Sequence, residues 1–330
     1  MNKWARFLLL LLSGVLLGCL AGCARDDARN REIRIGCFPN VTHVQALVAR
    51  NMSRHGEGWF ERYLPGYHLT WLTYNAGPSA MEALFGRTAD VTYVGPSPAL
   101  NAYAVSNGQE VRLLAGAVNG GAALLVHPQS GITHPQDFRG RCIATPQLGN
   151  TQDVSARAWL RRQGLHCELT GAGDCRIAPT PNAMQVQLMQ QGELDAAWTV
   201  EPWVSILEQK AGAQLLFNEP QVITTVLVGR VGWLRTHPQA AAALIRAHRE
   251  LTQWVREHPQ EAQARVAEEL SALTRSPVDT ALIASAWARL SLTDAINLDG
   301  LQQFVTDAQG VGLLDRVPPL QQMIYTPTQP

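Results

Sequence analysis

The sequence has no run of like charge, and its basic and acidic residues balance at 27 each. Proteins that bind nucleic acid usually carry a basic patch, so a nucleic-acid partner is not expected. The chain also has no CxxC motif, no pair of histidines at the spacing of metal ligands and no recognisable Ser-His-Asp arrangement. These absences argue against zinc binding and catalysis, so we expect a protein that is not an enzyme and holds no metal or cofactor.

The apolar run at residues 7–20 is too short to span a bilayer. It follows the basic residues Lys3 and Arg6, which is the pattern of a secretion signal. We therefore expect residues 1–22 to be a signal peptide. Removing them leaves 25 basic against 27 acidic residues, and the remaining chain is long enough for two domains with separate cores.

The residues just after the apolar run match the lipobox of bacterial lipoproteins. Residues 20–23 read LAGC, with two small residues directly before Cys23. Cleavage before Cys23 would leave it lipid-modified (palmitate), with residues 23–31 as a linker to a body held at a membrane surface. The alternatives are lipidation at Cys19 and an ordinary secreted protein cut near Ala24.

Four more cysteines remain in the mature chain, which we expect in an oxidising compartment. Cys167 and Cys175 flank a loop of turn residues at 168–174 and are predicted to form a local disulfide. The alternative is a pair of free thiols. Cys37 and Cys142 fall within predicted strands, where a cysteine usually serves as a small buried apolar residue.

Strands and helices alternate through the first two thirds of the chain, and only helices are expected after residue 238. The predicted strands are residues 32–37, 69–74, 90–95, 111–118, 122–127, 141–146, 175–179, 195–200, 215–217 and 222–231. This alternation is typical of an α/β fold with mostly parallel sheets covered on both faces. Ligands on such sheets bind beyond the carboxyl ends of the strands, where loops lead into helices.

Two extended apolar segments, 121–127 and 222–231, suggest one strand that leaves a first lobe and one that returns to it. We expect lobe 1 to comprise residues 32–119 plus 228–330, and lobe 2 to comprise residues 120–227. Two crossings of this kind form a two-strand hinge between α/β lobes.

Four segments carry a resemblance to a known family. They are residues 75–84 (NAGPSAMEAL), 90–98 (DVTYVGPSP), 146–153 (PQLGNTQD) and 198–203 (WTVEPW). In this order they resemble the periplasmic substrate-binding proteins of ABC importers, of the sulfonate, taurine and nitrate type, over about residues 33–267. The resemblance implies a two-lobed periplasmic-binding-protein-like fold (type II) that closes on a small ligand. The same fold serves thiamin-precursor binders and an enzyme of pyrimidine synthesis, whose cysteine-rich catalytic stretch is absent here.

The residues and the resemblance agree on a pocket of hydrogen-bond donors. A sulfonate is always ionised and only accepts hydrogen bonds, so helix-start N–H groups, hydroxyls and amides suit it without a lysine or arginine. The candidate ligand contacts are Asn40, His43, Ser79, Ser97, Gly121, Asn150, Thr151, Gln152, Trp198 and Glu201.

Several of these candidates have an ordinary structural alternative. Ser79 and Ser97 are equally suited to capping helices, and Trp198 to packing in a core. Gly121 is either a contact or a bend in a hinge strand. Glu201 either binds the ammonium group of a zwitterion such as taurine, or bridges to the other lobe or caps its own helix.

The leading hypothesis is a monomeric, lipid-anchored receptor in the cell envelope that presents a small organic anion to an ABC permease. An aliphatic sulfonate or taurine is the expected ligand. The alternative is a receptor of the same fold for a nitrogen compound, such as nitrate, urea or a thiamin-precursor pyrimidine. A lipoprotein that senses the same ligand for a membrane kinase would have the same binding features.

Overall fold

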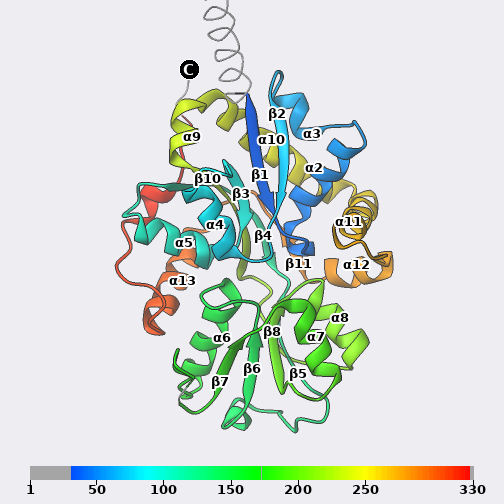
Figure 1. The fold of residues 1–330 in the computed structure, drawn as a ribbon, viewed down its shortest axis with the longest axis vertical. Helices are drawn as coiled ribbons and strands as arrows, with labels where there is room; N and C mark the ends of the chain where they lie inside the picture. The colour runs from blue at the N-terminus through cyan, green and yellow to red at the C-terminus, as the bar shows by residue number, and fades with distance from the viewer. Residues whose placement is uncertain (1–30, 172, 328–330) are drawn as a thin grey trace, which may run out of the picture.

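The computed structural model describes residues 31–171 and 173–327. The predicted signal peptide, Cys23 and the linker as far as residue 30 lie outside the described residues. The chain folds into two α/β lobes stacked along the long axis of the molecule (Figure 1). Among the described residues, no helix combines the length and hydropathy needed to cross a bilayer. The two-lobed α/β fold expected from the sequence is confirmed.

The first lobe is built on a six-stranded sheet with the order β11-β4-β10-β3-β1-β2. Its strands are β1 (Glu32–Cys37), β2 (His68–Thr73), β3 (Val91–Val94), β4 (Val111–Gly120), β10 (Ile223–Arg230) and β11 (Leu290–Leu292). β1 runs parallel to β2 and β3, whereas β10 pairs antiparallel with β3 and β4, and β11 pairs antiparallel with β4. The sheet is therefore mixed, because the returning strand β10 is inserted in its middle.

Helices cover both faces of this sheet. Successive residues of β10 alternate between two cores, with Val226 and Val228 in one and Leu227 in the other. The core that contains Leu227 packs against the helices α2 (Val44–Arg54), α3 (Trp59–Tyr63), α10 (Pro238–Glu257), α11 (Pro259–Thr274) and α12 (Thr280–Trp287). The core that contains Val226 and Val228 packs against α4 (Gly77–Phe85), α5 (Pro96–Val105) and α13 (Leu298–Gly310). The short elements of this lobe are η1 (Val41–His43), α9 (Val231–Thr236) and η3 (Leu320–Met323).

The second lobe has a five-stranded sheet with the order β7-β6-β8-β5-β9. Its strands are β5 (Ala122–Val126), β6 (Cys142–Thr145), β7 (Arg176–Pro179), β8 (Ala196–Val200) and β9 (Gln214–Asn218). β6 is parallel to β7 and β8, and β5 is antiparallel to β8 and β9. Its helices are η2 (Pro135–Phe138), α6 (Thr151–Arg162), α7 (Asn182–Gln190) and α8 (Trp203–Ala211). Cys167 and Cys175 are joined by a disulfide in the segment between α6 and β7.

The chain passes between the lobes at two neighbouring places. It leaves lobe 1 at Gly120 and Gly121, which both have positive φ (73°), a conformation that glycine adopts without steric cost. It returns between β9 and β10, and the Gly120 N–H donates to the Val222 carbonyl across the two crossings at 2.8 Å. Every residue of β10 lies in the first sheet, so the return falls before Ile223 and earlier than the predicted boundary at 227/228.

One element of the C-terminal part differs from the expectation of helices only. Leu290, Ser291 and Leu292 form the edge strand β11, which pairs with Gly120, Asn119 and Val118 at the end of β4. Three residues are too few to show a strand pattern in the sequence, and the pairing is supplied by a partner far away in the chain. β11 thereby brings the C-terminal segment against the first lobe crossing.

Candidate functional site

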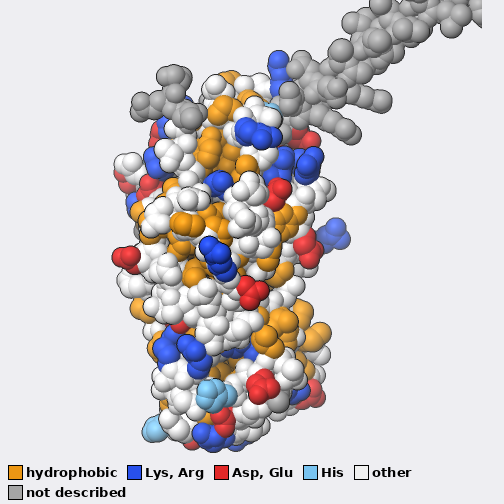
Figure 2. Space-filling model, turned by 90° about the vertical axis from the view of Figure 1, so that its left-hand side faces the viewer, with side chains coloured by type: hydrophobic (Ala, Val, Ile, Leu, Met, Phe, Trp, Pro, Cys, Tyr) orange, Lys and Arg blue, Asp and Glu red, His pale blue; other side chains and the backbone are white. Residues whose placement is uncertain are grey.

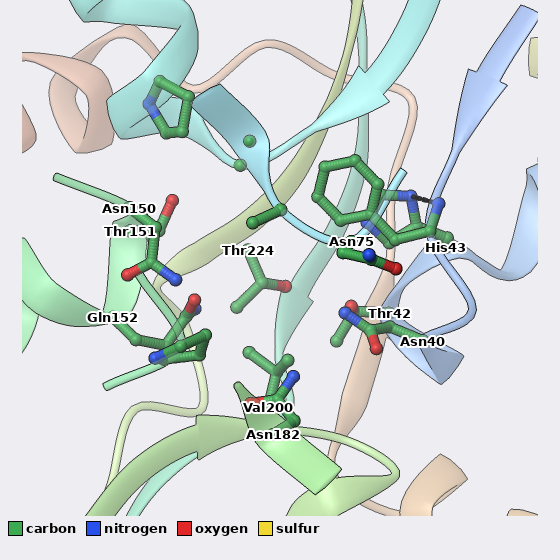
Figure 3. Close-up of a pocket in the computed structure, with 16 residues that line it drawn as sticks. Asn40, Thr42, His43, Asn75, Asn150, Thr151, Gln152, Asn182, Val200 and Thr224 are labelled. Carbon is green, nitrogen blue, oxygen red and sulfur yellow. Dashed lines mark hydrogen bonds between the residues drawn. The ribbon is translucent and has the colours of Figure 1, made fainter. Parts of the chain in front are cut away.

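A pocket of about 430 Å³ lies between the lobes, close to the two crossings (Figure 3). Both lobes contribute, and Figure 3 shows Asn150, Thr151 and Gln152 of lobe 2 facing Asn40, Thr42 and His43 of lobe 1. The lining residues are Phe38, Asn40, Thr42, His43, Asn75, Ala76, Gly77, Gly95, Pro98, Pro146, Asn150, Thr151, Gln152, Asn182, Val200 and Thr224.

Four helices begin at this pocket, two from each lobe. α4 and α5 follow β2 and β3 of lobe 1, and α6 and α7 follow β6 and β7 of lobe 2. The pocket is lined by Gly77 of α4, Pro98 of α5, Thr151 of α6 and Asn182 of α7, all in the first turn of their helices. Except at Pro78, Pro96 and Pro98, which have no N–H, the first-turn N–H groups have no partner within the helix and carry a partial positive charge, so this arrangement favours an anion.

The hydrogen bonds of two asparagines fix which end of each amide is free for a ligand. The Asn40 side-chain oxygen accepts from Trp203 Nε1 at 3.0 Å, and the Asn150 oxygen accepts from the Asp153 N–H at 2.8 Å. Both partners can only donate, so each asparagine must use its oxygen for these bonds. The NH2 groups of Asn40 and Asn150 are therefore left as donors at the pocket.

The Asn182 side-chain oxygen accepts from the Thr199 hydroxyl at 2.9 Å, but a hydroxyl can donate or accept, so this bond does not fix the Asn182 amide as Trp203 and the Asp153 N–H fix the other two. Two asparagines, Asn40 and Asn150, thus have their acceptors bonded within the protein while their donors stay available. The Thr224 hydroxyl is already used, since it donates to the Val118 carbonyl at 3.0 Å.

Thr151 marks the place where the lobes touch. Its Oγ1 is buried and has no hydrogen-bond partner, and it lies so close to Gly95 that a Cβ there would collide with it. Gly95 precedes α5 in lobe 1, whereas Thr151 begins α6 in lobe 2. The absence of a side chain at Gly95 therefore permits the lobes to meet with the Thr151 hydroxyl at the pocket.

His43 is neutral and has a defined tautomer. Burial lowers the pKa of His43 from 6.5 to about 3, since the charged imidazolium would lose its hydration. The Phe38 N–H donates to His43 Nδ1 at 3.4 Å, so the ring proton is carried by Nε2. His43 thus offers one more neutral donor group.

None of the described residues that line the pocket is ionised, because Asp, Glu, Lys and Arg are absent from the lining and His43 is uncharged. Figure 2 shows that basic and acidic side chains are interspersed on one outer face of the molecule, so no field of one sign is directed from that face. Recognition of a charged ligand would therefore rely on dipoles: helix starts, amides and a hydroxyl.

The structure brings five of the ten predicted site residues together in the pocket, namely Asn40, His43, Asn150, Thr151 and Gln152. Ser79 and Ser97 lie elsewhere. The Ser79 hydroxyl donates to the Ala76 carbonyl at 2.8 Å, within the first turn of α4. Ser97 lines a separate hollow between α4, α5 and α13, and its Oγ is buried without a partner. The placement of these two serines does not support ligand contact.

Gly121 and Trp198 also lie outside the pocket lining. Gly121 forms the bend of the first lobe crossing. Trp198 is fully buried in the core of lobe 2, where its ring packs against Trp159 and Phe217. Val200, two residues later on the same face of β8, ends the strand and lines the pocket, whereas Trp198 lies deeper in the strand and packs in the core.

Glu201 is tied to the protein rather than available to a ligand. Its carboxylate accepts from Arg289 at 2.8 Å and from the Ser205 hydroxyl and N–H at 3.0 and 3.1 Å. Burial raises the pKa of Glu201, whereas the Ser205 N–H and Arg289 favour the ionised form. Glu201 precedes α8, and its carboxylate both bridges to Arg289 of lobe 1 and accepts from the Ser205 N–H in the first turn of that helix, instead of facing an ammonium group.

Sequence reasoning did not single out Thr42, Asn75, Asn182 and Thr224 as site residues. Asn75 and Asn182 each stand near the start of a helix that follows a strand, which is the signal that marked Asn150. Thr42 and Thr224 carry no such signal. Thr224 reaches the pocket because β10 is inserted between β3 and β4.

The chain is similar in sequence to a protein from another organism. The chain is 26% identical over 209 residues to a protein of Bacillus subtilis (strain 168) assigned as an aliphatic sulfonates-binding protein. That match spans 62% of this chain and 58% of the relative.

Solved structures with low sequence identity share the fold. The alkanesulfonate-binding protein SsuA from Xanthomonas axonopodis pv. citri, bound to MOPS, has a TM-score of 0.73 at 18% identity, over 89% of this chain and 98% of that chain. The periplasmic aliphatic sulphonate binding protein SsuA from Escherichia coli has a TM-score of 0.71 at 19% identity, over 89% and 97%. The periplasmic nitrate-binding protein NrtA from Synechocystis PCC 6803 has a TM-score of 0.67 at 16% identity, over 86% and 82%.

A match to a described protein family covers residues 26–271, which is most of the chain. It includes all of lobe 2 and every pocket residue. The protein belongs to the NMT1-like family.

Proposed function

We propose that this protein is the substrate-binding protein of an ABC importer and captures a small organic sulfonate in the pocket between its lobes. It acts outside the cytoplasmic membrane, attached through a lipid on Cys23 and monomeric, and passes its ligand to a membrane permease. It binds the ligand without converting it. The sulfonate-binding relatives and the donor-lined pocket support this proposal.

The observation that carries the proposal is the orientation of the asparagines. The oxygens of Asn40 and Asn150 accept from Trp203 Nε1 and the Asp153 N–H, which can only donate, so the free groups of these two side chains are donors. A sulfonate has three equivalent acceptor oxygens and no proton at physiological pH, so it matches such a pocket. A phosphate monoester that retains a proton would need an acceptor, and so would urea or a pyrimidine with N–H groups.

Closure of the two lobes around a ligand is expected from the same arrangement of donors. Donors come from both lobes, so a bound anion would stabilise the arrangement in which the lobes meet at Gly95 and Thr151. The crossings at Gly120 to Gly121 and between β9 and β10 would absorb the movement. A permease that recognises both lobes would then distinguish the loaded protein from the empty one.

Nitrate is the second candidate ligand. It is also an anion that only accepts hydrogen bonds, and a nitrate-binding protein shares the fold. The pocket donors alone do not separate nitrate from a sulfonate. Titration calorimetry with methanesulfonate, nitrate and urea decides between them, and a sulfonate should bind most tightly.

The sharpest test replaces asparagine by aspartate at position 40 or 150. The new carboxylate still accepts from Trp203 or from the Asp153 N–H, but it presents an oxygen where the NH2 group was. We expect the affinity for methanesulfonate to fall by at least roughly a hundredfold, because a hydrogen bond to a charged group is lost and a like charge is added. Titration calorimetry measures the loss, and urea unfolding checks that stability is preserved.

Asn297→Asp is the matched control. Asn297 caps α13 with its oxygen on the Gly300 N–H at 2.9 Å, in the same way that Asn150 caps α6, but it does not line the pocket. Its affinity should equal that of the unmodified protein. Unchanged affinity in Asn40→Asp and Asn150→Asp would contradict the proposed pocket.

A further inference from the structure

We infer that Trp203, which lies in lobe 2, is a specificity-determining positioning residue for Asn40, which lies in lobe 1. Its indole N–H holds the Asn40 amide with the NH2 group toward the pocket, and this disfavours anions that keep a proton of their own. The inference rests on the proposed function and deepens it, because it names the residue that enforces a ligand with acceptors only.

The Asn40 side chain depends on Trp203 for its orientation. Asn40 precedes the short helix η1 but makes no capping hydrogen bond with its side chain. Among the described residues, the Asn40 amide has one hydrogen-bond partner, the Trp203 Nε1–H at 3.0 Å. The oxygen and the nitrogen of an amide are nearly equal in size, so without this partner either of them could face the pocket.

Trp203 selects one of these two orientations because an indole N–H can only donate. If the Asn40 amide turned over, its NH2 group would face the Nε1–H, and two donors would oppose each other. Asn40 is buried, so the reversed amide would lose its hydrogen bond with little water to replace it. The NH2 group is therefore held on the lobe 1 side of the pocket, which Figure 3 shows across from Asn150 and Gln152.

The segment that carries Trp203 is itself held against lobe 1. The Val41 N–H, next to Asn40, donates to the Glu201 carbonyl at 3.1 Å. The Glu201 carboxylate accepts from Arg289 at 2.8 Å. A backbone hydrogen bond and an ion pair thus accompany the indole contact, and a donor on the lobe 1 wall takes its orientation from lobe 2.

Asn150 is oriented in a different way. Its oxygen accepts from the Asp153 N–H of the helix that it caps, so its orientation is set within lobe 2 by a backbone group. A substitution at Trp203 therefore releases the Asn40 amide and leaves the Asn150 amide fixed. Trp203 is not among the described residues that line the pocket, so its effect on a ligand there would pass through Asn40.

The test compares two ligands of similar shape and equal charge by titration calorimetry. Methanesulfonate has only acceptor oxygens, whereas methylphosphonate at mildly acidic pH is a monoanion with a P–OH donor. The pKa of His43 is about 3, so the pocket lining stays uncharged under these conditions. In the unmodified protein methanesulfonate should bind at least roughly tenfold more tightly, because the P–OH group would meet donors.

Trp203→Phe keeps an aromatic ring and removes the indole donor. The released amide can turn its oxygen to the P–OH group, so methylphosphonate should bind at least roughly fivefold more tightly, while the affinity for methanesulfonate changes less. General damage to the fold would not produce such a gain. Trp59→Phe is the matched control, since Trp59 Nε1 also donates at 3.0 Å, to the Ala247 carbonyl, and Trp59 does not line the pocket. Its preference for methanesulfonate should equal that of the unmodified protein.

The same substitution in an Asn40→Ala background provides the second check. Without the amide, Trp203→Phe should leave the preference for methanesulfonate unchanged. A preference that is unchanged in Trp203→Phe alone, or that falls equally in the Asn40→Ala background, would overturn the positioning role. Equal affinity of the unmodified protein for both ligands would also overturn it and leave the proposed function intact. Failure of methanesulfonate to bind the unmodified protein would overturn the proposed function itself.

Discussion

The pocket and the lobe junction beside it use opposite chemistry. At the junction, Arg289 of lobe 1 donates to Glu201 and to both oxygens of Glu208 in lobe 2, each at 2.8 Å. On the other side of the molecule, Arg162 of α6 pairs with Asp307 of α13 at 2.9 Å. The pocket between these contacts is lined by neutral groups. Ion pairs thus hold the lobes to each other, whereas helix starts, amides and a hydroxyl would bind the proposed ligand.

The difference follows from the cost of an unpaired buried charge. An arginine in the pocket would need a partner whenever the ligand is absent, and a nearby carboxylate would then compete with the ligand for it. Amides and helix starts avoid this problem, because water satisfies them in the empty pocket. The chain keeps its buried carboxylate Glu201 paired with Arg289 permanently, which leaves the pocket uncharged and ready to accept an anion.

The largest expected effect comes from breaking the charged junction. Arg289→Ala would leave Glu201, whose side chain is 0% exposed, without its cation. Removing one partner of a buried ion pair costs about 3 to 5 kcal/mol of stability, which urea unfolding would measure. Arg249→Ala is the control, because Arg249 and Asp294 form an exposed pair at 3.7 Å and the expected loss is below about 1 kcal/mol. Equal losses of stability in Arg289→Ala and Arg249→Ala would show that the buried ion pair contributes no more than the exposed one.

A smaller effect is expected where the neutral lobe contact is broken. In Gly95→Ala the new Cβ collides with Thr151 Oγ1, so either the lobes stay apart or the hydroxyl turns away from the pocket. Overpacking of this kind costs about 1 to 3 kcal/mol, and we expect it to appear mainly as weaker sulfonate binding in calorimetry.

The double variant Gly95→Ala with Thr151→Ala provides the check. It removes the colliding atom, so its loss of affinity should be smaller than the sum of the two single losses. Strictly additive losses would mean that Gly95 and Thr151 do not form the closing contact.

The smallest effect concerns Glu219, a buried carboxyl in the segment that returns to lobe 1. Burial raises the pKa of Glu219 from 4.5 to about 7, opposed by the Ser155 hydroxyl, Arg162 and Trp198, while Asp307 adds to the rise. The folded state therefore binds a proton that the unfolded state releases above pH 4.5. Stability falls as the pH rises from about 4.5 to 7 and is then constant.

Glu219→Gln removes this titration. We expect the variant to gain about 1 to 2 kcal/mol over the unmodified protein at pH 8 and little at pH 4, measured by urea unfolding at both values. A difference that does not depend on pH would show that Glu219 is ionised throughout this range.

The sequence predicted the elements better than the contacts between them. Asn150, Thr151 and Gln152 could be found because a strand, a turn and a helix start are all visible locally, and such a junction exposes donors. The fold followed from strand and helix alternation for the same reason. The return crossing was placed a few residues late, because β10 is buried along nearly its whole length and its sequence gives no sign of which sheet it joins.

The candidates that lie outside the pocket lining do so because of contacts that are distant in the sequence. Nothing near Glu201 indicates that Arg289, 88 residues later, would occupy it. Trp198 was expected at a cleft because it lies near the end of a strand, yet β8 continues to Val200, and that residue reaches the pocket instead. Thr224 reaches the pocket only through the position of its strand in the sheet.

The low pKa of His43 has a consequence for the conditions under which the protein can work. With that imidazole neutral down to about pH 3 and no other ionisable side chain in the lining, acidification of the surroundings would leave the grip on a sulfonate unaltered. Acidity would be felt instead at Glu219, in the returning strand connection. The segment that returns to lobe 1, and not the pocket, would thus respond to protons.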